Sequence, residues 1–191
     1  MRLRNWLVIV PMLLAGCAVG VNFTKPADND LVVGVSKEAN ILAELGKPNF
    51  KSTKVVNGEN LPMDTYAYAV GGSGDGILPG VTPARSLGLI FKDGVLVQKV
   101  YTSSFKGDAT LFDADKAKSI KQGMTVAEVK GIMGKPSGEA VYPMTSSQDA
   151  HALIYSFTET KGFKSQQNLL TVEFGSDGVV TKSNFTQVGR L

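Results

Sequence analysis

The sequence has one cysteine and one histidine among its 191 residues. With a single cysteine no intramolecular disulfide can form, so stability must come from packing. A histidine-based catalytic triad or metal site would depend on His151 alone. This residue stands in the polar run 146–151, and no nucleophile-elbow motif accompanies it. We therefore expect His151 to be a surface-loop residue.

The motifs that hold cofactors or metals are also missing. The glycine-rich stretch 71–83 lacks both a following Gly-Lys-Ser/Thr and G-x-G-x-x-G spacing, so it is typical of a connector between strands. Asp113 and Asp115 could bind a cation, but Lys116 and Lys118 follow and no EF-hand loop does, which favours capping of a helix. Carboxylate pairs with glycosidase geometry are invisible in a sequence, and no motif argues for one. We predict no cofactor, no metal and no enzymatic activity.

The first sixteen residues predict an export signal. Arg2 and Arg4 precede an apolar run at 6–15, which is too short to span a membrane and typical of a secretory signal peptide. The sequence Leu14-Ala-Gly-Cys17 resembles the lipobox of bacterial lipoproteins. In that class the cysteine thiol receives a diacylglycerol before cleavage, and the freed amine receives a further acyl chain. An ordinary signal peptide with an incidental cysteine is the alternative.

Acylation of Cys17 would anchor the mature chain in a membrane, and its three acyl chains exceed the two that durable attachment needs. Ala18 rather than Asp follows, which in the lipoprotein class implies sorting to the outer membrane. Loss of residues 1–16 removes two arginines and no acids, so the net charge falls from +3 to +1. A chain so close to neutrality gives no reason to expect a nucleic-acid partner. We expect residues 17–30, which are polar and aperiodic, to form the lipidated N-terminus and a tether.

The stretch 123–136 predicts a short helix with both ends encoded. Thr125 and Glu128 have the spacing of a capping box, and an apolar stripe at helical spacing follows them. Gly134 supplies a left-handed residue that ends the helix, and Pro136 forbids its continuation.

A diverged copy of this stretch lies about 88 residues upstream, at 34–48. Ser36 is the expected cap there, although no acid occupies the capping-box position. In both copies a strand candidate and an apolar hairpin with an Asp-Gly turn follow, and the alignment matches Tyr155 with Tyr68. An internal duplication is the economical account.

These elements predict an α+β chain of two tandem units, each with one or two short helices packed on a three- to four-stranded antiparallel sheet. Residues 31–104 form the first unit and residues 105–191 the second, which gains an extra helix at 113–121. Because the segment 102–111 lacks periodicity, we expect the boundary there and two separately packed bodies.

The second copy carries a resemblance to a known family. Its pattern, Gly-Met-Thr…Glu-Val…Met-Gly-Lys-Pro, then a tyrosine strand, Leu-x-Val-x-Phe, Asp-Gly and Val-Val, resembles the SmpA/OmlA (BamE) family over 119–185, and 31–101 does so more weakly. The resemblance implies a small outer-membrane lipoprotein with helices on an antiparallel sheet. The family's best-known member is an accessory subunit of the β-barrel assembly machinery and has one such unit. Two units in one chain also resemble the tandem β-lactamase inhibitory proteins, secreted binders that present a concave sheet to an enzyme.

We therefore predict a lipid-anchored binding or scaffold protein of the outer membrane that faces the periplasm. Its role would lie in the assembly or maintenance of the envelope or of outer-membrane proteins, through a protein partner, and no small-molecule substrate is evident. A proteinaceous inhibitor of a periplasmic enzyme is the alternative, and a cell-wall hydrolase has the least support. Because aromatic residues are enriched in binding hot spots, Tyr66, Tyr142 and Phe50 are the candidate partner-binding residues, with Cys17 as the lipidation site.

Overall fold

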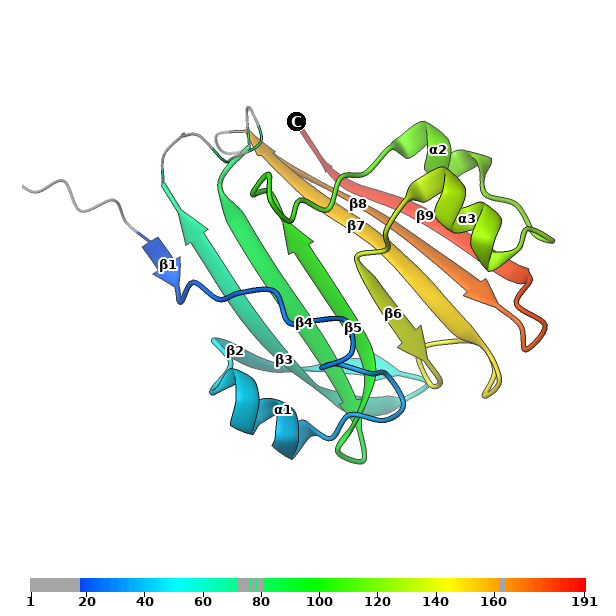
Figure 1. Cartoon of the computed structure of the whole chain (residues 1–191), viewed down its shortest axis with the longest axis horizontal. Helices are drawn as coiled ribbons and strands as arrows, with labels where there is room; N and C mark the ends of the chain where they lie inside the picture. The colour runs from blue at the N-terminus through cyan, green and yellow to red at the C-terminus, as the bar shows by residue number, and fades with distance from the viewer. Residues whose placement is uncertain (1–17, 72–75, 77, 79–80, 162–163) are drawn as a thin grey trace, which may run out of the picture.

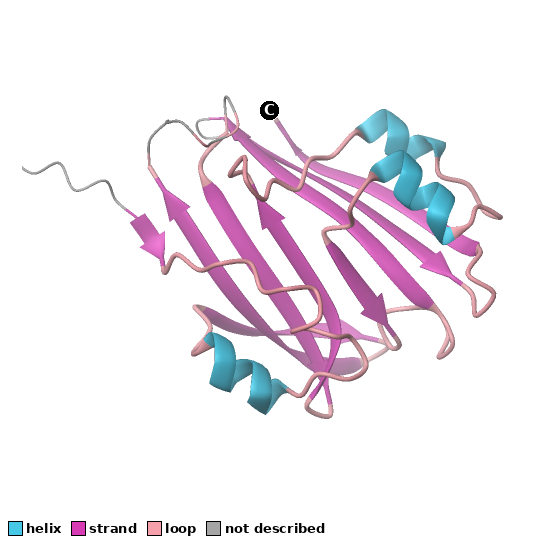
Figure 2. Ribbon diagram, in the orientation of Figure 1, coloured by secondary structure: helices cyan, strands magenta, loops and turns pink. Residues whose placement is uncertain are grey.

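The computed structural model describes residues 18–71, 76, 78, 81–161 and 164–191. Cys17 and most of the glycine-rich stretch 71–83 lie outside this part of the chain. Three short helices and nine strands are described (Figure 1 and Figure 2). In chain order they are β1 (Ala18–Gly20), α1 (Glu38–Leu45), β2 (Phe50–Val56), β3 (Glu59–Val70), β4 (Ala84–Lys92), β5 (Val95–Ser103), α2 (Ala114–Ser119), α3 (Val126–Met133), β6 (Gly138–Val141), β7 (His151–Lys161), β8 (Lys164–Phe174) and β9 (Val180–Arg190).

The described strands form one antiparallel sheet in the order β1-β3-β4-β5-β6-β7-β8-β9, and β2 also pairs with β3. The strands of the first half end at β5 and those of the second half begin at β6. These two strands pair directly, with Gln98–Val100 opposite Gly138–Ala140. The predicted combination of short helices with an antiparallel sheet is confirmed. Backbone hydrogen bonds join the two halves edge to edge in one sheet, while each half keeps its own core cluster beneath its helices.

The pairing of β5 with β6 requires a glycine at its end. A Cβ atom on Gly138 would lie 2.0 Å from the carbonyl oxygen of Lys99 and 2.8 Å from Cα of Val100. These neighbours are backbone atoms of the partner strand, so no side-chain rotation could relieve the clash. Gly138 therefore sets how closely the two halves of the sheet approach each other.

The two helices of the second half begin as predicted. The Thr125 hydroxyl accepts a hydrogen bond from the backbone N–H of Glu128, and the Glu128 carboxylate accepts one from the backbone N–H of Thr125, which is the predicted capping box of α3. The Asp113 carboxylate accepts from the backbone N–H groups of Asp115 and Lys116 and so caps α2. Gly134 follows α3 with a φ of 82°, in the left-handed region where glycine is favoured.

The start of α1 differs from the prediction. Its N-cap is Lys37, which makes no capping hydrogen bond with its side chain. The Ser36 hydroxyl instead accepts from the backbone N–H of Val32 at 2.9 Å. The first helical N–H, that of Glu38, donates to the carbonyl of Gly94 in the β4–β5 turn. A tertiary contact thus replaces the side-chain cap.

Both halves use a tyrosine to hold the end of their helix. The hydroxyl of Tyr66 on β3 donates to the carbonyl of Gly46 at 2.8 Å, and that of Tyr155 on β7 donates to the carbonyl of Gly134 at 3.3 Å. The residue of the first half that corresponds to Tyr155 is therefore Tyr66, two residues before the predicted Tyr68. These bonds satisfy carbonyl groups that a helix C-terminus leaves without partners.

The helices pack on one face of the sheet (Figure 2). Ile41 of α1 joins a buried cluster with Leu87, Leu89 and Phe91 of β4. On the same face, α2 and α3 pack against β7, β8 and the start of β9, and the buried residues of that cluster are Ala117, Ile120, Val129, Leu153, Tyr155, Leu170, Val172, Phe174 and Val180. The predicted apolar alternation in each hairpin therefore marks the helix-covered face.

The segment predicted as a tether lies against the sheet instead. Residues 18–20 form β1, which pairs with Tyr68–Val70. The Phe23 ring packs against Tyr66 and Tyr101, with ring centroids 6.4 and 6.3 Å apart. Further along, the carbonyls of Asp28 and Leu31 accept hydrogen bonds from the Lys99 ammonium. We call residues 21–31 the strap; it crosses the helix-covered face from β1 toward the junction of the halves (Figure 1).

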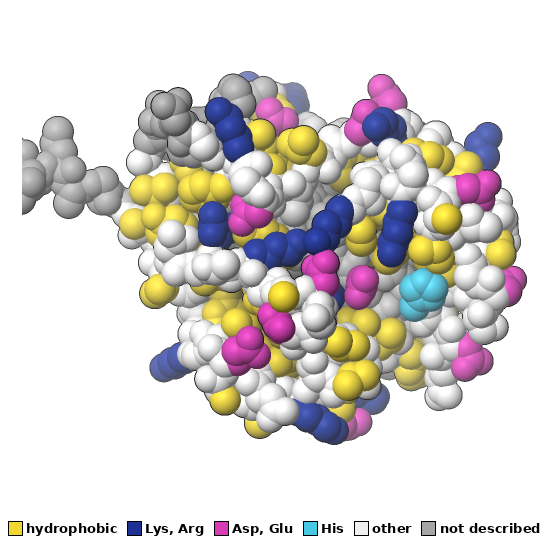
Figure 3. Space-filling view, in the orientation of Figure 1, with side chains coloured by type: hydrophobic (Ala, Val, Ile, Leu, Met, Phe, Trp, Pro, Cys, Tyr) yellow, Lys and Arg dark blue, Asp and Glu magenta, His cyan; other side chains and the backbone are white. Residues whose placement is uncertain are grey.

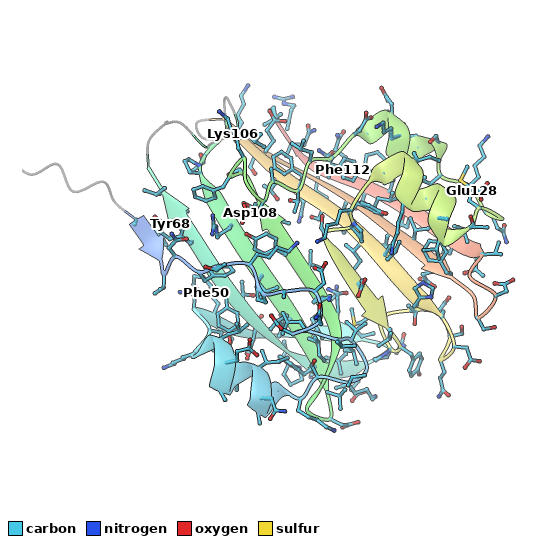
Figure 4. The ribbon with its side chains drawn as sticks, viewed as in Figure 1. Phe50, Tyr68, Lys106, Asp108, Phe112 and Glu128 are labelled. Carbon is cyan, nitrogen blue, oxygen red and sulfur yellow. The ribbon has the colours of Figure 1, made fainter. Side chains whose placement is uncertain are left out.

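The predicted boundary segment is also fixed in place. The Asp108 carboxylate accepts hydrogen bonds from the hydroxyls of Tyr101, at 2.6 Å, and Ser103, at 2.5 Å, and it lies 3.7 Å from the Arg85 guanidinium (Figure 4). Burial and the bond to Asp108 raise the pKa of Tyr101 to about 12. The segment that links the halves is therefore bound to the strands of the first half.

We predict that Gly138→Val lowers the free energy of unfolding by about 1–3 kcal/mol. Valine is otherwise favoured in strands, so a loss of stability in this variant would be attributable to the backbone clash with Lys99. Gly107→Val is the control, because a Cβ there meets no atom within 4 Å. Urea unfolding followed by circular dichroism measures both variants. Equal losses at the two positions would contradict the close approach at Gly138.

Candidate functional site

The face of the sheet opposite the helices is the candidate binding surface. Leu87 and Leu89 of β4 point toward α1, so Ser86 and Gly88, which alternate with them along the strand, belong to the other face. Among the described helices, α1, α2 and α3 all lie on the Leu87 side (Figure 2). We call the other side the open face. Met144, from the loop after β6, packs against one end of it.

The open face is hollowed at its centre. A hollow of about 370 Å³ draws its lining from six strands on both sides of the junction, namely Lys54, Met63, Thr65, Ser86, Gly88, Gln98, Val100, Thr102, Ile154, Ser156, Thr158, Gln167, Leu169 and Thr171. A second hollow of about 380 Å³ adjoins it and shares Ser86, Thr102 and Thr158. Because β5 and β7 both contribute, this surface exists only when the halves are joined.

The hollow follows from the shortness of β6. This strand has four residues, whereas β5 and β7 have nine and eleven and continue past its beginning. Ser137, which precedes β6, forms hydrogen bonds with both neighbouring strands. Its carbonyl accepts from the backbone N–H of Tyr101 on β5, and its hydroxyl accepts from the backbone N–H of Ser156 on β7. Beyond Ser137, Thr102 and Thr158 line a notch between the two strands.

The lining of the open face is polar but almost uncharged. Hydroxyl and amide side chains are interspersed with Met63, Val100, Ile154 and Leu169. Lys54 is the charged residue of the first hollow, and Arg85 borders the second from the helix-covered face, where it pairs with Asp108. None of the described residues that line the two hollows carries a carboxylate or an imidazole, the groups that most often serve as general acid or base. Depletion of charge is instead a feature of the cores of protein–protein interfaces.

The predicted partner-binding residues are not brought together. Tyr66 is 6% exposed and belongs to the core, because its ring packs under α1 and its hydroxyl binds Gly46. Phe50 is 58% exposed at the start of β2, where it pairs with Thr65 of the open face (Figure 4). Tyr142 is 39% exposed after β6, in the neighbourhood of Lys92. Cys17 lies outside the described residues.

The electrostatics around Tyr66 support a structural role for it. Burial, with a smaller contribution from the nearby Asp64 carboxylate, raises the pKa of Tyr66. Asp64 is itself buried and pairs with the Lys51 ammonium at 3.0 Å. Tyr66 therefore stays protonated and keeps donating to Gly46.

His151 differs from the prediction in its setting. It is the first residue of β7 rather than a loop residue, and its ring stacks on that of Phe174 with centroids 5.1 Å apart. Among the described residues no group of three or more His, Cys, Asp or Glu side chains could hold a metal ion. In the same part of the chain, no helix has the length and apolar character needed to cross a membrane.

Comparison with known proteins gives one match to a protein family. Residues 109–184 match the family model described as "Outer membrane protein assembly factor BamE domain". These residues include α2, α3 and most of the strands of the second half, where the sequence pattern resembles that family. No curated protein sequence matches the chain.

Solved structures include a distant match to most of the chain. A Streptococcus mutans protein described as a candidate β-lactamase inhibitor is 13% identical and overlaps with a TM-score of 0.43. The match covers 83% of this chain and 91% of that protein.

The sequence did contain a signal for the open face. Ser86, Ser156 and Thr171 each stand next to residues of the helix-covered core in the sequence, namely Leu87, Tyr155 and Leu170. Alternation alone cannot distinguish a solvated face from a binding face. What distinguishes this one is the hollow, which depends on the pairing of β5 with β6.

Proposed function

We propose that the chain is a non-catalytic binding protein of the bacterial outer membrane that faces the periplasm. Its role would be in the assembly or maintenance of outer-membrane proteins, through contact with a protein partner. The observation that carries this proposal is the match of 109–184 to the BamE domain, the domain of an outer-membrane protein assembly factor. The hollows of the open face carry few charged side chains, and no carboxylate or imidazole is among the described residues that line them, which fits binding better than catalysis.

The lipid anchor is part of the same proposal. Acylation of Cys17, within the lipobox-like Leu14-Ala-Gly-Cys17, would hold the chain at the membrane surface. Consecutive Cα atoms lie about 3.8 Å apart, so the anchor would sit one residue from β1 rather than at the end of a long tether. Val19 and Val21 at this edge are 64% and 72% exposed. We therefore propose that the β1 edge of the sheet is the part closest to the lipid.

The open face is the proposed contact surface for the partner. It extends across both halves, so a partner seated there would contact residues of β3 and β4 as well as β7 and β8. Phe50, at the edge of the sheet, would add an exposed aromatic anchor beside it.

Replacement of the proposed lipidation site gives the first functional prediction. Cells that express the chain and receive a labelled fatty acid should incorporate the label into wild-type protein, whereas Cys17→Ser should carry none and should leave the membrane fraction. Immunoprecipitation followed by gel autoradiography measures this. Equal label on the variant, or none on wild type, would rule out the anchor.

Site-specific photo-crosslinking tests the proposed partner and the face together. A photoreactive residue at Thr102 or Thr171 of the open face should form adducts with a β-barrel outer-membrane protein or a component of its assembly machinery. The control position is Lys118, exposed on α2. Adducts from Lys118 but not from Thr102 or Thr171 would place the interface on the helices.

The identity of the adduct separates the two classes of binding protein. If the partner at Thr102 is a soluble periplasmic enzyme whose turnover falls on addition of this protein, the chain is an inhibitor and the assembly role is excluded.

A further inference from the structure

A pocket on the helix-covered face lies at the junction of the two halves. It has a volume of about 510 Å³, and its walls come from the strap, β4, β5, the end of α3 and the start of β6. Its charged lining residues are Lys25, Asp28, Lys99, Lys130, Lys135 and Glu139. Figure 3 shows lysine side chains gathered near the centre of this face with acidic side chains beside them. The pocket is separate from the open face.

The lysines outnumber the acids in this pocket by four to two. Asp28 lies 2.8 Å from the Lys135 ammonium and 4.0 Å from that of Lys25, so one carboxylate serves two cations. Glu139 lies 3.6 Å from Lys99, whose ammonium also donates to the carbonyls of Asp28 and Leu31. Lys130 makes no ion pair within the described part of the chain. The pocket thus keeps an excess of two positive charges.

Lys25 is the most constrained of these lysines, since it lies near Lys135 as well as near the carboxylates of Asp28 and Asp108. Burial, followed by repulsion from Lys135, lowers the pKa of Lys25, and its ammonium lies 5.2 Å from the centre of the Tyr101 ring. The fold thus holds a partly desolvated cation beside a second one. Asp28 offsets part of this repulsion, and a further anion that reaches both ammonium groups would relieve the rest.

The surroundings limit the kind of anion. The floor is apolar, since Leu31, Leu87 and the Tyr101 ring line it and are each at most 3% exposed. The C-terminus of α3 opens on the pocket at Gly134, and its partial negative charge opposes a dianion. No arginine fork and no helix N-terminus, the groups that favour phosphate, are among the lining residues.

We propose that this junction pocket binds a single carboxylate on an apolar stem, held by Lys25 and Lys135 alongside Asp28, with Lys130 at the rim. The carboxylate belongs either to a small organic acid or to an acidic side chain in a peptide. Either ligand bridges the strap and the second half, and so strengthens the contact between the halves. This function is additional to partner binding on the open face and does not depend on it.

Calorimetric titration of the purified full chain at low ionic strength tests the proposal. The probes are 4-methylpentanoate, the peptide acetyl-Leu-Glu-Leu-amide, its Gln analogue and inorganic phosphate. We expect saturable binding of at least one carboxylate probe, and for the peptide a loss of about tenfold in affinity on Glu to Gln exchange. Binding of 4-methylpentanoate alone assigns a free organic acid, and binding of the peptide alone assigns an acidic segment.

Matched variants locate the site. Lys25→Gln and Lys135→Gln should each weaken binding about fivefold, since each removes one partly exposed charge pair. Lys118→Gln on α2 should have no effect, because Lys118 pairs locally with Asp115. If Lys25→Gln fails to fold, Lys130→Gln, at an exposed position, replaces it. The proposal is overturned if neither carboxylate binds, if phosphate binds as tightly, or if Lys118→Gln weakens binding as much as the pocket variants.

Discussion

The close approach of Gly138 to the backbone of Lys99 and Val100 is the constraint on which the rest of the structure depends. The close approach allows β5 and β6 to pair. Only three residues of each strand take part, yet this pairing joins two half-sheets into one. The open face and the junction pocket both draw their walls from the two halves. Each surface therefore requires this short ladder of backbone hydrogen bonds.

The N-terminal strap reinforces the same junction from the helix-covered side. It follows β1, packs Phe23 on the tyrosines of the first half, and carries Asp28, which pairs with Lys135 of the second half. Exposed ion pairs are individually weak, so the apolar contacts of Phe23 and Leu31 supply most of the attachment. With the strap bound, the proposed anchor at Cys17 would connect almost directly to the folded sheet.

The features that could be predicted from the sequence were those determined by residues close to one another in the chain. The capping box of Thr125 and Glu128 and the turn at Asp93-Gly94 need only local spacing and backbone geometry. The failures all involve distant partners: Ser36 lost its capping role because Gly94 serves the helix, and Tyr66 is buried because it binds Gly46. The continuous sheet, the docked strap and the lysine pocket depend on which strand edges meet, and no local pattern encodes that.

The central claim, that one sheet unites the halves, is tested most directly by native-state hydrogen exchange of the full chain. We predict that the slowest amides of β4 and of β8 open with free energies within about 1 kcal/mol of each other, because both report the same global unfolding. Amides of β5 opposite β6 should be protected alongside them. If β8 remains protected at denaturant concentrations where β4 and β5 already exchange freely, the halves unfold independently and the claim is contradicted.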